Sequence, residues 1–249
     1  FVDAMCCSAN VALNVNYPLI TINDINSEVI NLFKVLRETP EDFTRAIYYT
    51  PFSREELYKI INGEYSSSND IERARQYFVR SQLGYGANGS QNKHKGFAID
   101  YRIQRSNFYK VDNWSAKLKK LPAIIEKLRS FQIENVSVFK LIEKINRPDV
   151  VLYIDPPYVL DTRSSKKRYT YEWSDDMHEK LASIVKNANC FVAVSGYQCD
   201  LYDDLFKTFK KTQSPPTRST MTRELRYEYL WTNYDPATVN GNLKLDFNE

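Results

Sequence analysis

The chain has 249 residues, enough for one sizeable α/β domain or for one domain that carries an inserted module. This length rules out a small disulfide-stabilised peptide. Hydrophobic residues make up 43% of the sequence and aromatic residues 14%, which argues against intrinsic disorder. The longest apolar runs, residues 150–154 and 191–194, are far shorter than the roughly 18 to 20 residues of a bilayer span, so we expect a soluble protein. The formal charge of +3 permits a polyanionic partner without requiring one.

The cysteine and histidine content gives no indication of a metal site. The sequence has four cysteines, Cys6, Cys7, Cys190 and Cys199. They include no C-x-x-C pair, and only His94 and His178 are present to assist them, so we expect no bound metal. We expect His178 on a helix surface, with no role. Four cysteines are too few for a disulfide scaffold, and no charged-then-apolar leader precedes the fold, which favours a reducing cytoplasm.

The first 112 residues predict half of a nucleotide-binding unit followed by an insertion. Residues 1–38 indicate a strand, a helix, a second strand and a second helix. Residues 39–112 contain short charged helical pieces and a stretch rich in Gly, Asn and Gln, which predicts an inserted, mainly helical module. Because the chain opens at Phe1 and not at Met, we also expect that residues upstream are missing.

Strands and helices alternate again over residues 113–249. The predicted elements are a helix at 115–131, a strand at 136–139, a short helix, a strand at 150–154, a helix at 175–187 and a strand at 191–194. The aromatic strand 227–234 suits an antiparallel edge hairpin. This order predicts a doubly wound parallel α/β sheet, with 1–38 and 113–249 as one domain and 39–112 as its insert.

The strongest motif is Asp155-Pro156-Pro157-Tyr158, which directly follows the apolar strand 150–154. Ligands of open α/β sheets bind at the carboxyl ends of strands, so the position of this motif indicates a functional site. A stiff Pro-Pro turn with Asp155 as its cap is the structural alternative.

The motif suits chemistry on an exocyclic amine such as adenine N6. Such an amine is a poor nucleophile because its lone pair is delocalised into the ring. The Asp155 carboxylate and the Pro156 carbonyl, held by the fixed φ angles of proline, can each accept one N–H bond and draw that pair out. Tyr158 would stack on the base, and the gain would come from placing the amine in line with a methyl sulfonium. A base in a duplex must first be flipped out of the helix.

These motifs, taken in order, resemble those of the Dam-like, D12-class N6-adenine DNA methyltransferases, which are common in phages and restriction-modification systems. Besides Asp-Pro-Pro-Tyr, the resemblance rests on Phe1-Val2-Asp3, Ile22-Asn23-Asp24-Ile25-Asn26, Thr50-Pro51-Phe52-Ser53-Arg54-Glu55-Glu56, Ser165-Lys166-Lys167-Arg168-Tyr169, Val194-Ser195-Gly196-Tyr197 and Arg226-Tyr227-Glu228-Tyr229-Leu230-Trp231. It implies a Rossmann-like sheet, S-adenosylmethionine as cofactor, double-stranded DNA as substrate and residues 39–112 as the target-recognition module. It also implies a monomer in the cytoplasm of a bacterial cell or phage-infected host, with a cognate restriction endonuclease as a potential partner.

Two acidic residues are predicted to contact the cofactor, together with Asp155. Asp24 lies 21 residues after Asp3, at the end of the second predicted strand, where an acidic residue meets ribose hydroxyls in nucleotide-binding units. The alternative is that Asp24 caps the helix beginning near Asn26. The resemblance places Asp3 beside the cofactor, and its alternative role is likewise a helix cap.

The sequence departs from the family pattern in the first loop, residues 4–10. The resemblance places Met5 where the family has an aromatic residue, and Cys7 and Ala9 where it has two glycines. A residue with a Cβ atom at positive φ costs roughly 1 to 2 kcal/mol. Ser137 stands where the family often has an acidic residue near the adenine of the cofactor, and the family's N-terminal Lys/Gly-rich motif would lie before Phe1.

DNA contacts are predicted in three places. Arg73, Gln76, Tyr77 and Arg80 recur at helical spacing, so one helix face could present cations to phosphates, unless it is a solvated face with Tyr77 in the module core. The polar stretch 88–95 suits base-edge readout through Asn88, Gln91 and Lys93, or is simply a polar loop. Lys166, Lys167 and Arg168 follow the motif closely enough to contact the backbone beside a flipped base, or belong to an ordinary charged loop.

The sequence thus predicts a methyltransferase that acts on adenine N6 in duplex DNA. One alternative is a DNA-binding relic of such an enzyme, whose altered cofactor loop no longer supports catalysis. The other is a methylase of a different exocyclic amine, cytosine N4 or an RNA adenine. Cofactor affinity separates the first alternative, and analysis of the modified nucleosides separates the second.

Overall fold

A computed structural model describes residues 1–65, 67–84, 96–97, 110–163, 170–218 and 225–237. The chain divides into two compact units. Unit 1 contains the described residues of Phe1–Ile25, Glu134–Lys167 and Tyr171–Glu249, and unit 2 contains those of Asn26–Ile133 and Arg168–Thr170.

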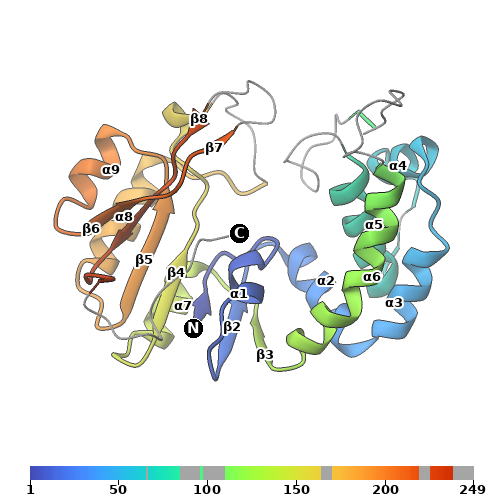
Figure 1. Ribbon diagram of the computed structural model, residues 1–249, viewed down its shortest axis with the longest axis horizontal. Helices are drawn as coiled ribbons and strands as arrows, with labels where there is room; N and C mark the ends of the chain where they lie inside the picture. Colours follow the sequence, from blue (N-terminus) through green and yellow to red (C-terminus); the bar gives the residue numbers. More distant parts are fainter. Residues whose placement is uncertain (66, 85–95, 98–109, 164–169, 219–224, 238–249) are drawn as a thin grey trace. The chain divides into compact units, whose positions relative to one another are not determined.

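The described strands form a seven-stranded, mostly parallel sheet and a separate two-stranded hairpin. In the order of the sheet, the strands are β3 (Phe131–Glu134), β2 (Ile20–Asn23), β1 (Val2–Asp3), β4 (Val151–Ile154), β5 (Phe191–Gly196), β9 (Tyr229–Thr232) and β6 (Lys210–Gln213). β1 runs parallel to β2 and β4, and β4 runs parallel to β5. β9 is antiparallel to both β5 and β6. The predicted Rossmann-like α/β class is confirmed (Figure 1).

The middle strand, β4, carries the core of unit 1. All four of its residues are buried, as expected of an apolar run that is covered on both faces. The helices of unit 1 are α1 (Asn10–Asn14), α7 (Val138–Ile145), α8 (Asp175–Val185) and α9 (Asp200–Leu205), with the 3-10 turn η1 (Leu160–Thr162). On α8 the buried positions 178, 181, 182 and 185 follow the helical period, so one face of the helix packs on the core.

Two expectations from the sequence are wrong. The strand predicted at 136–139 lies five residues earlier, as β3, because Ser137 caps α7 by accepting a hydrogen bond from the Lys140 N–H at 3.3 Å. Val138, Leu141 and Ile142 then repeat at helical spacing. His178 lies in the core and not on a helix surface, because its Nδ1 atom shares a 3.0 Å hydrogen bond with the Tyr202 hydroxyl.

Helices make up most of the described part of unit 2. They are α2 (Ser27–Glu38), α3 (Pro40–Tyr48), α4 (Arg54–Ile61), α5 (Asp70–Leu83) and α6 (Lys110–Leu128). α5 packs against α2, α3 and α4. Side chains of Asn26, Ser53 and Asn69 cap the amino ends of α2, α4 and α5. Unit 2 therefore includes α2 and α6, whereas the sequence boundaries at 39 and 112 assign them to the catalytic domain.

A buried ion-pair network holds α4 and α5 together. The Arg75 guanidinium donates to both Glu72 carboxylate oxygens, at 2.6 and 2.7 Å, and to Glu56 Oε1 at 2.5 Å. It also donates to the Thr50 hydroxyl at 3.1 Å. These partners raise the pKa of Arg75 in spite of its burial, so the side chain stays charged inside the module.

None of the described helices combines the length and apolar character that crossing a membrane requires.

We expect substitution of Gly196, the last residue of β5, to create a packing defect. A Cβ atom there would lie 2.8 Å from a ring carbon of the buried Tyr202. We expect Gly196→Ala to lower the free energy of unfolding by about 1 to 3 kcal/mol, because the packed ring has no free space to move into. Urea denaturation measures this loss. Gly96→Ala is the control, since its new methyl group meets no atom within 4 Å; equal stabilities of the two variants would contradict the prediction.

Candidate active site

The Asp-Pro-Pro-Tyr motif lies at the carboxyl end of the middle strand β4. Pro156 and Pro157 are buried, Tyr158 is half-buried and Asp155 keeps an accessible surface. The Ser195 hydroxyl, from β5, donates to Asp155 Oδ1 at 2.8 Å. Because protein surrounds the carboxylate on most sides, desolvation raises the pKa of Asp155, and hydrogen bonds from Ser195 and Tyr158 counteract this rise. Among the described residues its partners are thus side chains and not the N–H groups of a turn, which disfavours the capping alternative.

An aromatic pair stands beside this carboxylate. The rings of Tyr158 and Tyr197 lie edge to face, with centroids 4.7 Å apart and an angle of 76° between their planes. Tyr197 directly follows β5, the neighbour of β4 in the sheet. The sequence motif 194–197 was noticed, but no role was assigned to Ser195 or Tyr197. Their position after a buried strand is the signal that could have found them.

Asp3, at the end of β1, is a buried carboxyl group with an unsatisfied oxygen. The residue is 2% exposed, and its Oδ1 atom has no hydrogen-bond partner among the described residues. Burial raises the pKa of Asp3 to about 7, and the negative charges of Asp155 and Asp24 add to this rise. The backbone groups of Ala12 and Met5 oppose this rise in the pKa.

Asp24 lies just after β2 and faces the loop that follows β1. Its Oδ2 atom accepts a 3.0 Å hydrogen bond from the Cys7 N–H. The cap of α2 is Asn26, whose side-chain oxygen accepts from the Glu28 N–H at 3.1 Å. The alternative that Asp24 caps this helix is therefore wrong, and its half-buried carboxylate remains directed at the loop.

The loop after β1 has the strained backbone that its sequence predicts. Cys7 has a φ angle of 45° and Ala9 one of 54°, in the left-handed region that glycine occupies without strain. Burial and the nearby charges of Asp24 and Asp155 raise the pKa of the Cys7 thiol to about 11, so the thiol is neutral at physiological pH.

The buried amide of Asn23 fixes the loop in place. Its Nδ2 atom donates to the carbonyls of Ala4 and Val136, at 2.8 and 3.0 Å, and its Oδ1 atom accepts from the Val136 N–H at 3.0 Å. Its backbone carbonyl accepts from the Cys6 N–H at 2.8 Å. Sequence reasoning assigned no role to this residue.

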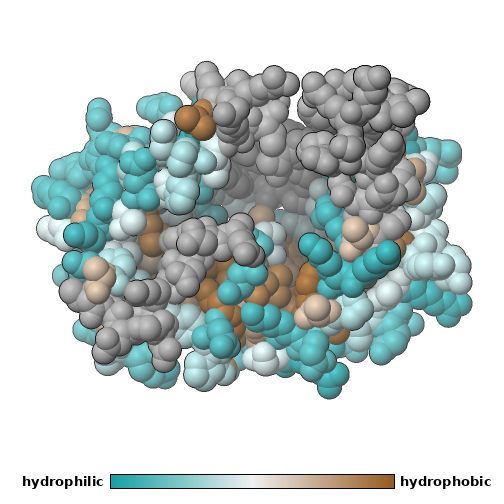
Figure 2. All heavy atoms as spheres, viewed as in Figure 1, coloured by the Kyte–Doolittle hydropathy of each residue, from teal (hydrophilic) through white to brown (hydrophobic). Residues whose placement is uncertain are grey.

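Two further predicted cofactor residues lie nearby. Met5 is half-buried against the core of unit 1, and Ser137 caps α7 with its hydroxyl. Hydrophobic atoms are visible around α1 on a face that is otherwise mostly hydrophilic (Figure 2). The loop of Cys7 and Ala9 directly precedes α1.

Some of the predicted DNA contacts lie on the described helix α5, and the others lie outside the described residues. Arg73, on α5, is bonded to Glu28 at 2.5 Å and to Asp70 at 3.0 Å, and Gln76 donates to Glu72 and to the Tyr65 carbonyl. Arg80 and Tyr77, on the same helix, are half-buried. The remaining predicted contacts, Asn88, Gln91, Lys93, Lys166, Lys167 and Arg168, lie outside the described residues.

A mostly parallel sheet with Asp-Pro-Pro-Tyr at the end of its middle strand, and acidic residues at the ends of β1 and β2, defines a Rossmann-like methyltransferase. Comparison with known proteins specifies the class further. The family model of the D12 class N6 adenine-specific DNA methyltransferases matches residues 1–221, and the chain belongs to this family. It is therefore a DNA adenine methyltransferase, of a family whose methyl donor is S-adenosylmethionine.

Curated relatives share low sequence identity with the chain. It is 26% identical over 238 residues to the Type II methyltransferase M1.LlaDCHI of Lactococcus lactis subsp. cremoris. This alignment covers 86% of this chain and 78% of the relative. It is 25% identical over 216 residues to the Retron Ec67 DNA adenine methylase of Escherichia coli, covering 84% and 72%. A DNA adenine methylase of Vibrio cholerae serotype O1 is 22% identical over 155 residues, covering 61% and 53%.

Strain at Cys7 predicts a stabilising substitution. Cys7→Gly should remove roughly 1 to 2 kcal/mol of strain, against a loss of roughly 0.5 to 1 kcal/mol from the more flexible unfolded chain. We therefore expect the free energy of unfolding to rise by about 0.5 to 1 kcal/mol, measured by urea denaturation. Cys7→Ala, which keeps the Cβ atom, is the control and should give no gain. A glycine variant no more stable than the alanine variant would contradict this account.

The raised pKa of Asp3 predicts a pH-dependent stability. The unfolded chain releases this proton near the ordinary value of 3.8, whereas the folded chain holds it up to a pKa of about 7. The contribution of Asp3 to stability therefore falls as the pH rises from about 4 to 7. Asp3→Asn should be more stable than the wild type at pH 8, by roughly 4 kcal/mol, and similar to it at pH 4. Denaturation curves at the two pH values check this, and parallel pH profiles would contradict it.

Proposed function

We propose that this chain transfers the methyl group of S-adenosylmethionine to the N6 amine of an adenine that is flipped out of duplex DNA. The observation that carries this proposal is the Asp155 carboxylate, held by the Ser195 hydroxyl at the carboxyl end of β4 beside a tyrosine pair. When bound, the cofactor supplies an activated methyl group on a positively charged sulfur.

The residues at the ends of β1 and β2 suit this cofactor. The unsatisfied Oδ1 atom of Asp3 is a buried acceptor next to two other carboxylates, which favours a positively charged ligand. Asp24 has the position at which an acidic side chain accepts from ribose hydroxyls. The full set of proposed cofactor-binding residues is Asp3, Met5, Cys7, Asp24, Ser137 and Asp155.

Asp155 positions the amine in this proposal. Ser195 and Tyr158 both hydrogen-bond this carboxylate, and because its two oxygens offer about four acceptor positions, it can also accept one N–H of the amine. The Pro156 carbonyl accepts the other N–H, and Pro157 keeps the turn rigid. Tyr158 stacks on the base, and Tyr197 supports its ring at 4.7 Å. Because only the ionised carboxylate accepts in this way, and burial raises the pKa of Asp155, we expect activity to rise with pH.

DNA binding requires further residues beyond this site. We propose residues 39–112 as the target-recognition module. The proposed DNA contacts are Arg73, Arg80, Asn88, Gln91, Lys93, Lys166, Lys167 and Arg168. Arg73 would have to exchange its partners Glu28 and Asp70 for a phosphate. We further propose that the protein acts as a monomer, in the cytoplasm of a bacterial cell or phage-infected host, with a cognate endonuclease in the same system.

The second candidate function is a DNA-binding relic without catalysis. The strain at Cys7 and Ala9 favours it, because a Cβ atom projects from both positions in the loop beside Asp3 and Asp24. Calorimetric titration of S-adenosylmethionine separates the two functions. Micromolar binding that Asp24→Ala weakens supports the enzyme, and absence of binding supports the relic.

Removal of the Asp155 carboxylate tests the proposed chemistry. We expect Asp155→Ala to lower methyl transfer by at least about 10²-fold, because the amine loses its charged acceptor, while DNA affinity stays within a few fold. Transfer of labelled methyl groups to adenine-containing duplexes measures the rate, and mass spectrometry of the nucleosides identifies the methylated base. Asp149→Ala, at the exposed turn before β4, is the matched control. Near-normal turnover of Asp155→Ala would refute the mechanism, and N4-methylcytosine as the product would refute the assigned base.

A further inference from the structure

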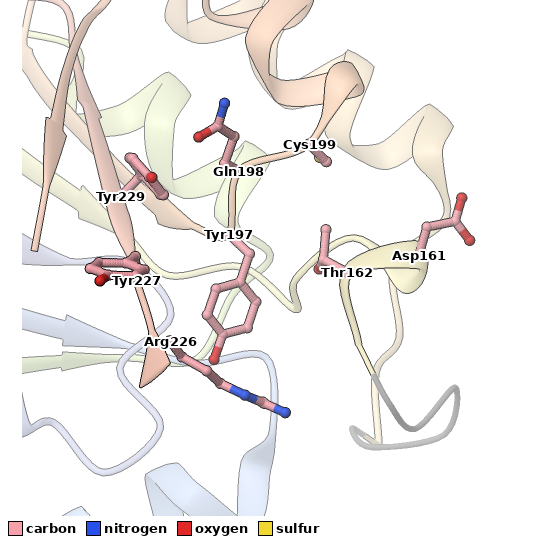
Figure 3. Close-up of a pocket in the computed structure, with 8 residues that line it drawn as sticks. All are labelled: Asp161, Thr162, Tyr197, Gln198, Cys199, Arg226, Tyr227 and Tyr229. Atoms are coloured by element: carbon pink, nitrogen blue, oxygen red, sulfur yellow. The ribbon is translucent and has the colours of Figure 1, made fainter. Parts of the chain in front are cut away.

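A pocket of about 460 Å³ opens in unit 1 beside the tyrosine pair (Figure 3). Its lining includes Thr162, which lies in η1 shortly after the Asp-Pro-Pro-Tyr motif. It also includes Tyr197 and Gln198, which follow β5. Arg226 from β8 (Leu225–Arg226) and Tyr227 line it from the hairpin side. The Tyr197 ring, which lines this pocket, also contacts the ring of Tyr158 in the proposed adenine site.

Arg226 is the cation of this pocket. Its guanidinium carbon lies 6.0 Å from the centroid of the Tyr197 ring, and Figure 3 shows the two side chains next to each other. Among the described residues Arg226 forms no ion pair, and it is half-buried. The Asp161 carboxylate, also at the pocket, points away from it in Figure 3. The guanidinium is therefore held by an aromatic ring, an interaction that is weak beside a charged hydrogen bond.

The charges around the proposed reaction centre make this cation important. Asp3, Asp24 and Asp155 are all acidic, and the charges of Asp24 and Asp155 both act on Asp3. A DNA strand that brings an adenine to Asp155 also brings its phosphates towards these carboxylates. A cation one tyrosine ring away from Tyr158 offsets that repulsion at the point where the strand must enter.

We infer that Arg226 binds the phosphate adjacent to the extruded adenine and thereby positions the target nucleotide. This inference rests on the proposed function. The planar guanidinium matches a phosphate with two parallel N–H bonds, and it is only weakly hydrated, so it leaves the Tyr197 ring at little cost. Arg226 acts as a positioning residue, since it contacts the backbone and not the reacting atoms.

The salt dependence of DNA binding tests whether the charge of Arg226 contributes to binding. The probe is a fluorescein-labelled duplex that carries the sequence methylated by the wild-type protein, titrated at several KCl concentrations. Arg226→Gln should weaken binding about tenfold and reduce the salt slope by about one phosphate equivalent, whereas Arg226→Lys should keep the slope. Arg147→Gln is the matched control and should change neither, because Arg147 is exposed and lies before β4, away from its carboxyl end. An unchanged slope in Arg226→Gln would overturn the inference.

Duplexes in which one phosphate is neutralised test which phosphate Arg226 contacts. Duplexes with a methylphosphonate at each phosphate that flanks the target adenine are compared in the wild type and in Arg226→Gln. At the contacted phosphate, neutralisation should weaken wild-type binding about tenfold and the variant hardly at all. The inference would be overturned if the losses of affinity from phosphate neutralisation and from Arg226→Gln simply add at every flanking phosphate. It would also be overturned if the loss of affinity depends on the neighbouring base and not on which phosphate is neutralised.

Steady-state kinetics separates a positioning role from a structural one. For Arg226→Gln we expect the KM for the duplex to rise about tenfold with kcat within about threefold, and Arg226→Lys to restore most of the difference. A fall in kcat alone, with KM and salt slope unchanged, would overturn the inference. If the wild type binds the duplex but methylates no adenine, the proposed function fails. If it methylates normally and Arg226→Gln does too, only the inference about Arg226 fails.

Discussion

The side-chain amide of Asn23 holds the candidate active site together. It is 1% exposed and bonds the carbonyl of Ala4 and both backbone groups of Val136, so it joins the segments that follow β1, β2 and β3. β1 has only two residues, too few to fix the following loop by strand pairing alone. An apolar side chain in its place would leave three backbone groups without partners, each at a cost of about 1 to 3 kcal/mol. This one buried amide therefore ties the start of the loop with Cys7, at Ala4, to the segment that follows β3.

On this frame the chain places groups that repel one another or strain the backbone. The charges of Asp24 and Asp155 disfavour ionisation of Asp3, and the Oδ1 atom of Asp3 has no hydrogen-bond partner among the described residues. Cys7 and Ala9 take up a conformation that suits glycine. Each feature destabilises the folded chain by itself, and their concentration at the ends of adjacent parallel strands is typical of a site shaped for a ligand. A positively charged ligand would relieve the repulsion, and a cation such as Arg226 is needed where a polyanionic strand approaches.

The order of the motifs allowed the fold class and the catalytic motif to be predicted, and relatives at 22 to 26% identity belong to the same chemical class. Residue-level detail was less predictable. Arg73 and Arg75 are two positions apart on α5, yet Arg73 bonds surface carboxylates while Arg75 is buried between Glu56 and Glu72. The residues around 131–139 contain apolar side chains that suit either a strand or a helix, and the Ser137 cap decided where α7 begins. His178 reads as a polar residue on an amphipathic helix, but Tyr202 provides the hydrogen bond that allows its burial.

By itself, the sequence determined that a rigid Asp-Pro-Pro-Tyr turn ends a buried strand and that acidic residues end two strands before it. The family resemblance added that residues with a Cβ atom occupy a loop in which the family has glycines. Turn chemistry and periodicity are local properties, so they can be read from neighbouring residues. Only the tertiary structure decided that Ser195 bonds Asp155, that Tyr197 contacts Tyr158, and that Arg226 covers the Tyr197 ring. These partners lie tens of residues apart, and they meet because β5 pairs with β4 on one side and with the antiparallel β9 on the other.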